Sequence, residues 1–392
     1  MISFASIDRI GGLIREDGTG VVYREDTPGR EAALTGVFPD GACLAVTTGS
    51  FDLDEYLEGR MKQRFYRFDP VSGEREELFT SWPDHGQFGN IFILDNDTLL
   101  LSDGIMGSQL LWITDLQGKD RAPLWEKPEG YAYGMSLSPD RGTLAYHLTG
   151  AGNAYNHPGC HYSINTVSLR DGRRTLVCEK PGHLMFGSAW TADGKRLLFQ
   201  DCHADADPGH LFSDVAAASP DGSEVRYLTR DQGSVFATSF GKPEWRSGGS
   251  NYPVPLPDGR AVFTVRSPGA HPDCDVDLSR GNHRELGYKP ENAKGGAWLV
   301  LCDLETGEMT DLTHYEEGRW DFRPCPSPDG NRLLYTSARN GTRSEIRLCR
   351  TDGTEDRFLT SGHDDTGADH ARFCDENVSE KTEMIWKAFA RN

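Results

Sequence analysis

The sequence contains no long apolar run. Only 37% of its 392 residues are hydrophobic, and no stretch approaches the roughly 18 apolar residues that a membrane-spanning helix needs. The first residues, MISFASIDRIGGLIRED, do not combine a basic segment with an apolar one, so they do not resemble a signal peptide. We therefore expect no membrane partner.

Paired cysteines and an excess of basic residues are also absent. The nine cysteines include no C-x-x-C pair, and a chain of this size does not need disulfides, which favours reduced thiols and a cytoplasmic location. Lys and Arg total 41 against 60 Asp and Glu, for a net charge of −19. Because nucleic-acid affinity rests on basic surface, no nucleic-acid partner is expected. An anionic substrate would need a local basic pocket.

Several catalytic signatures are missing too. The sequence has no G-x-S-x-G turn and no segment typical of an α/β-hydrolase domain, so a peptidase of the prolyl-oligopeptidase type is not expected. No P-loop and no G-x-G-x-x-G follows a predicted strand, so neither of these nucleotide-binding motifs is present.

What the sequence does contain is a repeated turn, in keeping with its 44 glycines and 21 prolines. An Asp-centred turn precedes a β-rich strand such as CLAVTTG, RLLFQD or RLLYTSA, which is a strong hairpin signal. A second hairpin follows each first one, and two hairpins make one four-stranded propeller blade. The first turns are at 38–41, 95–97, 138–142, 191–194, 256–259 and 327–330, and the second at 69–73, 115–118, 169–172, 219–222, 303–307 and 350–353.

The predicted fold class is therefore all-β, with residues 1–392 forming a single β-propeller domain. We expect seven blades, the last one divided between residues 1–30 and 370–392, with a first hairpin in 370–389 and a second in 13–26. Strands from both ends would close the ring and protect the sheet edges. Six blades are the alternative.

The histidines are unevenly placed in this pattern. All twelve lie in the loops between second and third strands, in the links between blades, or at the strand ends next to them. These segments share one face of a propeller, whereas the short hairpin turns lie on the other. Long variable loops on a rigid scaffold often carry function, although polar residues also prefer long loops for structural reasons. His183, His203 and His210 flank one hairpin and are the candidate catalytic histidines.

The stretch from Gly182 to Thr229 resembles the oligogalacturonate lyases, which are seven-bladed propellers of about this length. In that family a Gly-His pair opens the fourth blade, a Cys-His loop follows its second strand, and a Pro/His/Asp-rich insertion comes next. The comparable residues are Gly182-His183, Cys202-His203, Pro208-Gly209-His210 and Asp221-Gly222-Ser223. The resemblance implies cleavage of a uronic-acid oligosaccharide by β-elimination.

The family also binds a divalent metal similar to manganese, through a histidine that opens blade five and a Gln-x-x-His-x-His run that opens blade seven. Here the first place reads Gly249-Ser250-Asn251-Tyr252, without histidine. In the second only His370 remains, and Asp365 stands where the glutamine would be. His370 and Asp365 are therefore the candidate ligands of an altered site for manganese or calcium, and absence of a metal is the alternative.

A lyase of this kind must remove the proton at C5 of the sugar, next to a charged carboxylate. It needs a base near that proton and a cation on the carboxylate. A neutral histidine suits the first role, and arginine suits the second because its planar fork binds a carboxylate with two hydrogen bonds. Arg323 is the candidate for the catalytic site. The substrate-binding candidates are Arg246, Arg372, His85, Tyr252 and Trp320, of which the two aromatics could stack on sugar rings or fill gaps between blades.

Three functions follow from these observations. The first is a propeller lyase acting on a small acidic oligosaccharide. The second is a glycoside hydrolase using paired carboxylates in the same pocket, such as Asp205 and Asp207. The third is a non-catalytic, TolB-like interaction propeller. The enzymes require histidines and an arginine to converge, whereas the interaction module predicts dispersed histidines. The sequence does not predict the oligomeric state.

Overall fold

Every regular element in the described part of the chain is a β-strand. The computed structural model describes residues 2–6, 12–14, 16–19, 22–23, 31–48, 62–69, 74–83, 88–103, 110–125, 130–149, 162–203, 212–229, 253–267, 274–276, 286–288, 294–339, 345–360 and 368–373. Within these ranges, no helix is long and apolar enough to span a membrane.

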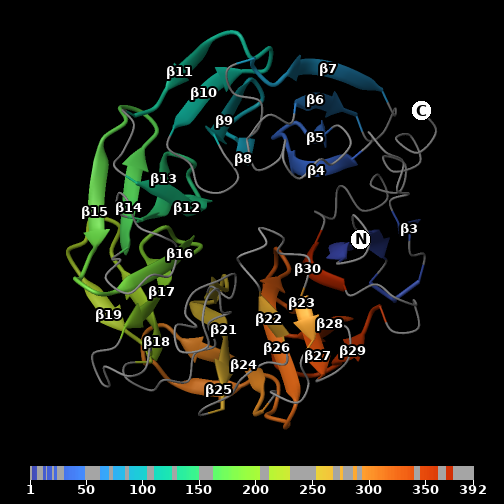
Figure 1. The fold of residues 1–392 in the computed structure, drawn as a ribbon, viewed down its shortest axis with the longest axis vertical. Coiled ribbons are helices and arrows are strands. Elements are labelled where there is room, and N and C mark those ends of the chain that lie inside the picture. The colour runs from blue at the N-terminus through green and yellow to red at the C-terminus, as the bar shows by residue number, and fades with distance from the viewer. Residues whose placement is uncertain are drawn as a thin grey trace.

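Successive strands pair antiparallel into sheets that follow one another along the chain, and Figure 1 shows them arranged around a common centre. The first four sheets have four strands each. They are β4 (Glu31–Val37) to β7 (Arg75–Thr80) through β5 (Cys43–Thr48) and β6 (Gln63–Phe68); β8 (Phe88–Ile93), β9 (Thr98–Asp103), β10 (Leu111–Asp115) and β11 (Arg121–Pro123); β12 (Tyr131–Leu137), β13 (Thr143–Thr149), β14 (Tyr162–Ser168) and β15 (Arg174–Cys178); and β16 (Leu184–Trp190), β17 (Leu197–His203), β18 (Phe212–Ala218) and β19 (Val225–Tyr227).

The next two sets of strands are joined by one parallel bridge between Ala297 and Trp320. In Figure 1, β4, β8, β12 and β16 lie nearer the centre than the other strands of their sheets, and β11, β15 and β19 lie at the periphery. The first set is β20 (Val254–Pro255), β21 (Arg260–Arg266), β24 (Ala297–Asp303) and β25 (Met309–Asp311); the second is β26 (Arg319–Pro326), β27 (Arg332–Arg339), β28 (Glu345–Arg350) and β29 (Arg357–Phe358); β22 (Cys274–Val276) and β23 (Leu286–Tyr288) form a separate hairpin. The arrangement is that of an all-β propeller.

The two ends of the chain meet in one sheet. β30 (Ala368–Phe373) pairs with β1 (Ile2–Ser6), which continues into β2 (Gly12–Ile14) and β3 (Val22–Tyr23). The N-terminal segment supplies three strands of this sheet, whereas two were expected. The first three residues of the segment ISFAS alternate apolar and polar, as in a strand with two different faces. The rest of the hairpin expected in 370–389 lies outside the described residues.

The predicted Asp-Gly turns join the strands where the sequence placed them. The N–H of Gly41, Gly194 and Gly330 donates to the carbonyl three residues earlier, each at 2.8 Å. These glycines have φ values of 88°, 70° and 71°, a region that favours a residue without a Cβ atom. In the longer turn at 138–142, Arg141 takes the corresponding position with φ 58°.

Adjacent sheets pack face to face through their apolar side chains. Phe199 and Ala216 of the β16–β19 sheet contact Ile164 of the β12–β15 sheet. On its other face, Leu198 packs with Phe263 of the next sheet. Strand β17 is consequently buried along its whole length, and its polar residues lie deep between sheets.

Candidate functional site

Strand β17 carries Gln200, Asp201 and His203 among apolar residues, in a run that is buried throughout. Asp201 stands opposite Asp214 of β18, and His203 stands opposite Phe212. Because side chains two residues apart on a strand share a face, Asp201, His203 and Asp214 point to the same side of the sheet. The sequence segment thus brings two carboxylates beside one of the predicted histidines.

The first histidine–aspartate pair joins His183 to Asp201. The Nδ1 atom of His183 lies 3.0 and 2.9 Å from Oδ1 and Oδ2 of Asp201. Asp201 is fully buried and His183 is 4% exposed. A carboxylate only accepts hydrogen bonds, so Nδ1 must donate, and Nε2 is the nitrogen of a neutral His183 that carries the basic lone pair.

The second pair joins His203 to Asp214 through the other ring nitrogen. Nε2 of His203 lies 2.8 Å from Oδ2 of Asp214. Oδ1 of Asp214 accepts the Thr229 hydroxyl at 2.9 Å, which itself accepts the N–H of Val215 at 2.8 Å. The rings of His183 and His203 are stacked, with centroids 5.0 Å apart and planes 16° apart. The structure therefore brings together two of the three predicted catalytic histidines.

Two further residues complete this cluster. The Tyr227 hydroxyl donates to Oδ2 of Asp201, and Lys180 Nζ donates to the Tyr227 oxygen at 2.6 Å. The ammonium group also lies 4.2 Å from the centroid of the Tyr227 ring. The sequence analysis missed Asp201, Asp214, Tyr227 and Lys180. One signal was available, since an aspartate two residues before a histidine on a strand lies on the same face.

Arg323 lies in an irregularity of β26, between the paired residues Phe322 and Cys325. Its φ is 55°, whereas glycines hold the same bulge position in β12 and β16, as Gly134 with φ 54° and Gly187 with φ 68°. A side chain in this left-handed region costs about 1–2 kcal/mol. Burial lowers the pKa of Arg323 to about 10. The guanidinium lies 5.6 Å from the Phe322 ring.

His147 is a buried histidine of a different kind. Its Nδ1 accepts the N–H of Gly187, at 3.1 Å, from the neighbouring sheet. It is fully buried, and its ring is parallel to that of Tyr133, with centroids 5.5 Å apart. Burial lowers the pKa of His147 to about 3, so the ring is neutral. It links two blades and was not singled out from the sequence.

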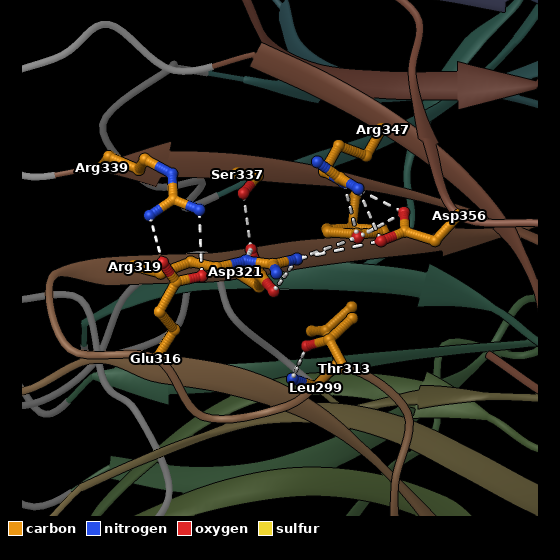
Figure 2. Close-up of polar contacts among 10 residues, drawn as sticks. Leu299, Thr313, Glu316, Arg319, Asp321, Ser337, Arg339, Arg347 and Asp356 are labelled. Atoms are coloured by element: carbon orange, nitrogen blue, oxygen red, sulfur yellow. Dashed lines mark hydrogen bonds and ion pairs between the residues drawn. The ribbon is translucent and has the colours of Figure 1, made fainter. Parts of the chain in front are cut away.

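A second network of charged side chains lies in the β26–β29 sheet (Figure 2). Arg319 pairs with Asp321, at 2.9 Å, and Arg347 pairs with Asp356, at 2.6 Å. The Tyr335 hydroxyl accepts from both arginines, at 3.4 and 3.0 Å, and donates to Asp356 at 2.7 Å. Nothing in the sequence analysis pointed to this network.

The remaining predicted site residues divide into two groups. Trp320 is only 3% exposed and packs against Ala297 and Phe322, so it fills a gap between sheets and offers no face for stacking. The side chains of Arg372 and His370 in β30, and all of His85, His210, Arg246, Tyr252 and Asp365, lie outside the described residues. Among the side chains that are described, no three His, Cys, Asp or Glu residues are grouped to hold a metal ion.

A cleft of about 440 Å³ lies at the other end of the blades, between the hairpin turns of the β12–β15 and β16–β19 sheets. It is lined by turn residues, among them Asp140, Asp193 and Asp221, and by Trp190. Trp190 is half-buried beside this cleft and also packs against a core cluster shared by the two sheets.

No protein-family model matches the chain. A part of 163 residues, 38% of the chain, is 28% identical to the "Uncharacterized peptidase YuxL" of Bacillus subtilis, of which it covers only 21%. The puromycin hydrolase structure (S511A mutant complexed with PGG) has a TM-score of 0.56 at 18% identity, over 91% of this chain and 50% of that one. The β-propeller domain of the trilobed protease from Pyrococcus furiosus has a TM-score of 0.52 at 13% identity, over 91% and 88%.

Oligogalacturonate lyases and TolB proteins also match, with TM-scores of 0.45 or less. The two solved structures described above with TM-scores over 0.5 show that this chain has a propeller fold. They do not single out the lyases. The chain spans half or less of the puromycin hydrolase and of the peptidase that it matches.

Proposed function

We propose that the protein is a propeller enzyme that cleaves an acidic oligosaccharide by β-elimination, with His183 and His203 as its proton-transfer groups. The observation that carries the proposal is the contact of two buried histidine–aspartate pairs, with ring centroids 5.0 Å apart. A histidine oriented by a carboxylate is a recurrent arrangement for moving protons in enzymes. Dispersed histidines, as in an interaction module, would not produce it.

The elimination needs two proton transfers. A base takes the C5 proton, the electrons of that bond form the C4–C5 double bond, and the C4–oxygen bond breaks. The departing oxygen then takes a proton from an acid. A neutral imidazole supports the first transfer and an imidazolium the second. Two adjacent imidazoles, each held by its own buried carboxylate, could therefore serve both transfers.

The substrate carboxylate requires a cation, and Arg323 is our candidate. A non-glycine residue held at φ 55°, where two other blades have glycine, is the kind of backbone strain that persists at functional positions. We propose Arg246, Arg372, His85 and Tyr252 as further substrate contacts and His210 as a third possible base, all as sequence-based proposals. Trp320 is no longer proposed, because it is buried.

A divalent metal would withdraw charge from the substrate carboxylate and so acidify C5. The candidate ligands remain His370 and Asp365, for manganese or calcium. His183 and His203 each direct a nitrogen to an aspartate, and no ligand group of three such residues is formed among the described side chains. The proposed mechanism therefore assigns no step to a metal.

A second candidate function is the recognition or hydrolysis of peptides. It is favoured by the proteins to which this chain is similar, which include a peptidase, a hydrolase and the propeller domain of a protease. The same cluster would then contact a peptide.

One assay separates the two candidates. Ultraviolet absorbance is followed during incubation with uronic-acid oligosaccharides, with and without divalent metal or chelator, and amine release is followed with a peptide panel in parallel. A rise in absorbance from the new double bond, lost in His183→Ala and His203→Ala, supports the lyase. Sensitivity to chelator would support a metal at His370 and Asp365. Amine release without absorbance would overturn the lyase in favour of the peptidase function.

We also infer a ring of seven blades, a single domain closed by both ends of the chain. Support comes from the pairing of Ile2 with Phe373 across β1 and β30. If this pairing closes the ring, the double variant Ile2→Cys/Phe373→Cys will form an intramolecular disulfide on oxidation. Absence of the crosslink in the folded protein would contradict the closure.

A further inference from the structure

The cluster in the β16–β19 sheet extends past Asp201 to a cation. Asp201 is fully buried and accepts hydrogen bonds from His183 and Tyr227, and Lys180 donates to the Tyr227 oxygen at 2.6 Å. We infer that Tyr227 and Lys180 are positioning residues that allow His183 to remain neutral beside Asp201. This inference rests on the proposed function, because a neutral His183 is what a base requires.

The physical argument starts from the buried charge. A carboxylate removed from water is strongly destabilised unless it is paired or receives several hydrogen bonds. If His183 were its only strong donor, Asp201 would favour the protonated imidazole, which cannot accept a proton from a substrate. Tyr227 supplies a second donor, and its oxygen is polarised by the Lys180 ammonium, so hydrogen bonding in the chain is strengthened cooperatively. The negative charge is then satisfied without a proton on His183 Nε2.

The backbone supports the same assignment. The carbonyl of Lys180 accepts the N–H of His183 at 3.1 Å, and the carbonyl of His183 accepts the N–H of Tyr162 at 2.9 Å. Lys180 therefore positions His183 in two ways. Its backbone carbonyl bonds to His183 directly, and its side chain acts through Tyr227 and Asp201. Lys180 is half-buried in the link between β15 and β16, and the series of hydrogen bonds that begins at its ammonium group ends at His183.

Other ionisable groups near His183 come from each element packed around it. His203 stacks on it from β17, and Asp214 of β18 holds His203. The link from β15 contributes Cys178 and Glu179 as well as Lys180. Burial and the charge of Asp201 raise the pKa of Cys178 to about 11, so this thiol stays neutral. Glu179 is exposed. Lys180 is the cation of this link, and it donates to Tyr227, through which it is connected to Asp201.

The test is Tyr227→Phe, with Tyr335→Phe as the matched control. Both changes remove a tyrosine hydroxyl that donates to an aspartate and accepts from a cation, but Tyr335 lies in the β26–β29 sheet. Histidine side chains are observed by ¹⁵N NMR at pH 7, where imidazolium and the two neutral tautomers have distinct shifts. We expect Tyr227→Phe and Lys180→Met to raise the imidazolium fraction of His183. In Lys180→Arg this fraction should lie between those of Lys180→Met and the wild type. Tyr335→Phe should leave it unchanged.

The kinetic expectation is a fall in kcat of about tenfold for Tyr227→Phe, the scale of one hydrogen bond to a charged group, with KM unchanged. The acidic limb of the pH–rate profile should also move to higher pH. An unchanged His183 spectrum in Tyr227→Phe overturns the inference. Because the spectrum is read without substrate, a wild-type protein inactive on every sugar would overturn the proposed function and leave the positioning role standing or falling on the spectrum alone.

Discussion

The β16–β19 and β26–β29 sheets each contain a network of ionisable side chains, and the two networks differ in the groups that pair with their aspartates. In the β26–β29 sheet, Arg319 and Arg347 face Asp321 and Asp356 across the Tyr335 hydroxyl (Figure 2). Guanidinium groups stay protonated at all ordinary pH values, so this network has a fixed charge. Imidazoles exchange protons near neutral pH. We therefore expect the arginine–aspartate network to support the fold, whereas the histidine–aspartate pairs are the groups proposed to transfer protons.

The largest expected effect comes from replacing one aspartate in each sheet by asparagine. Asp201→Asn replaces the acceptor of His183 Nδ1–H by a group that can donate, which favours the wrong tautomer. On the proposed function, kcat/KM should fall about 10³- to 10⁴-fold. Asp356→Asn should leave kcat/KM unchanged and lower the free energy of unfolding by about 1 kcal/mol, because Arg347 loses the charge of a partner that is partly exposed to solvent.

Enzyme assays and urea denaturation of both variants measure this difference. Equal losses of activity in the two variants would show that the cluster around His183 has no special part in the reaction. Equal losses of stability with full activity would assign both networks to the fold.

A third buried histidine sharpens the comparison, since His147 has a backbone N–H as partner where His183 has a carboxylate. Burial lowers the pKa of His147 to about 3, below its usual value of 6.5. Between these values the unfolded chain binds a proton that the folded protein does not. Stability is therefore fully present above pH 6.5 and falls on acidification by about 1.4 kcal/mol per pH unit, until the folded pKa is reached.

Urea denaturation between pH 4 and 7 measures this slope. His147→Gln keeps an acceptor for the N–H of Gly187 and removes the titration. The free energy of unfolding of this variant should therefore depend on pH less steeply than that of the wild type, by about 1.4 kcal/mol per pH unit. An identical slope in the variant would mean that other groups cause the acid sensitivity.

The sequence predicted the hairpins well because each depends on a few adjacent residues. The glycines at 41, 194 and 330 adopt the positive φ that their turns require. The convergence of His183 and His203 also followed from strand order. Asp214 was missed because its role depends on the pairing of β17 with β18, which is a property of register and not of local sequence. Asp201 lies two residues before His203 on the same strand, so its place on the same face could have been predicted. Trp320 was predicted either to stack on a sugar ring or to fill a gap between blades, because these two roles look alike in sequence, and the structure shows the second.

Arg323 could be predicted only in part from the sequence, and its substitution has the smallest expected effect on the protein. Its place at the end of a blade was visible in the sequence, but the bulge that gives it φ 55° depends on the pairing of β26 with β27. Arg323→Ala and Arg323→Gly both remove the guanidinium, so both should weaken binding of an acidic oligosaccharide. They differ in the backbone, and the glycine variant should be more stable by about 1 kcal/mol.

Denaturation and isothermal titration of the two variants measure these effects, and Gly134→Ala is the reciprocal control. Its Cβ would lie 2.8 Å from Nδ1 of His147 at φ 54°, so this variant should be destabilised. If Arg323→Gly is no more stable than Arg323→Ala, the backbone at this bulge stores no strain. If both variants bind acidic oligosaccharides as the wild type does, Arg323 holds the fold and not the substrate. Retention of the arginine against its backbone preference would then need a structural explanation within the β26–β29 sheet.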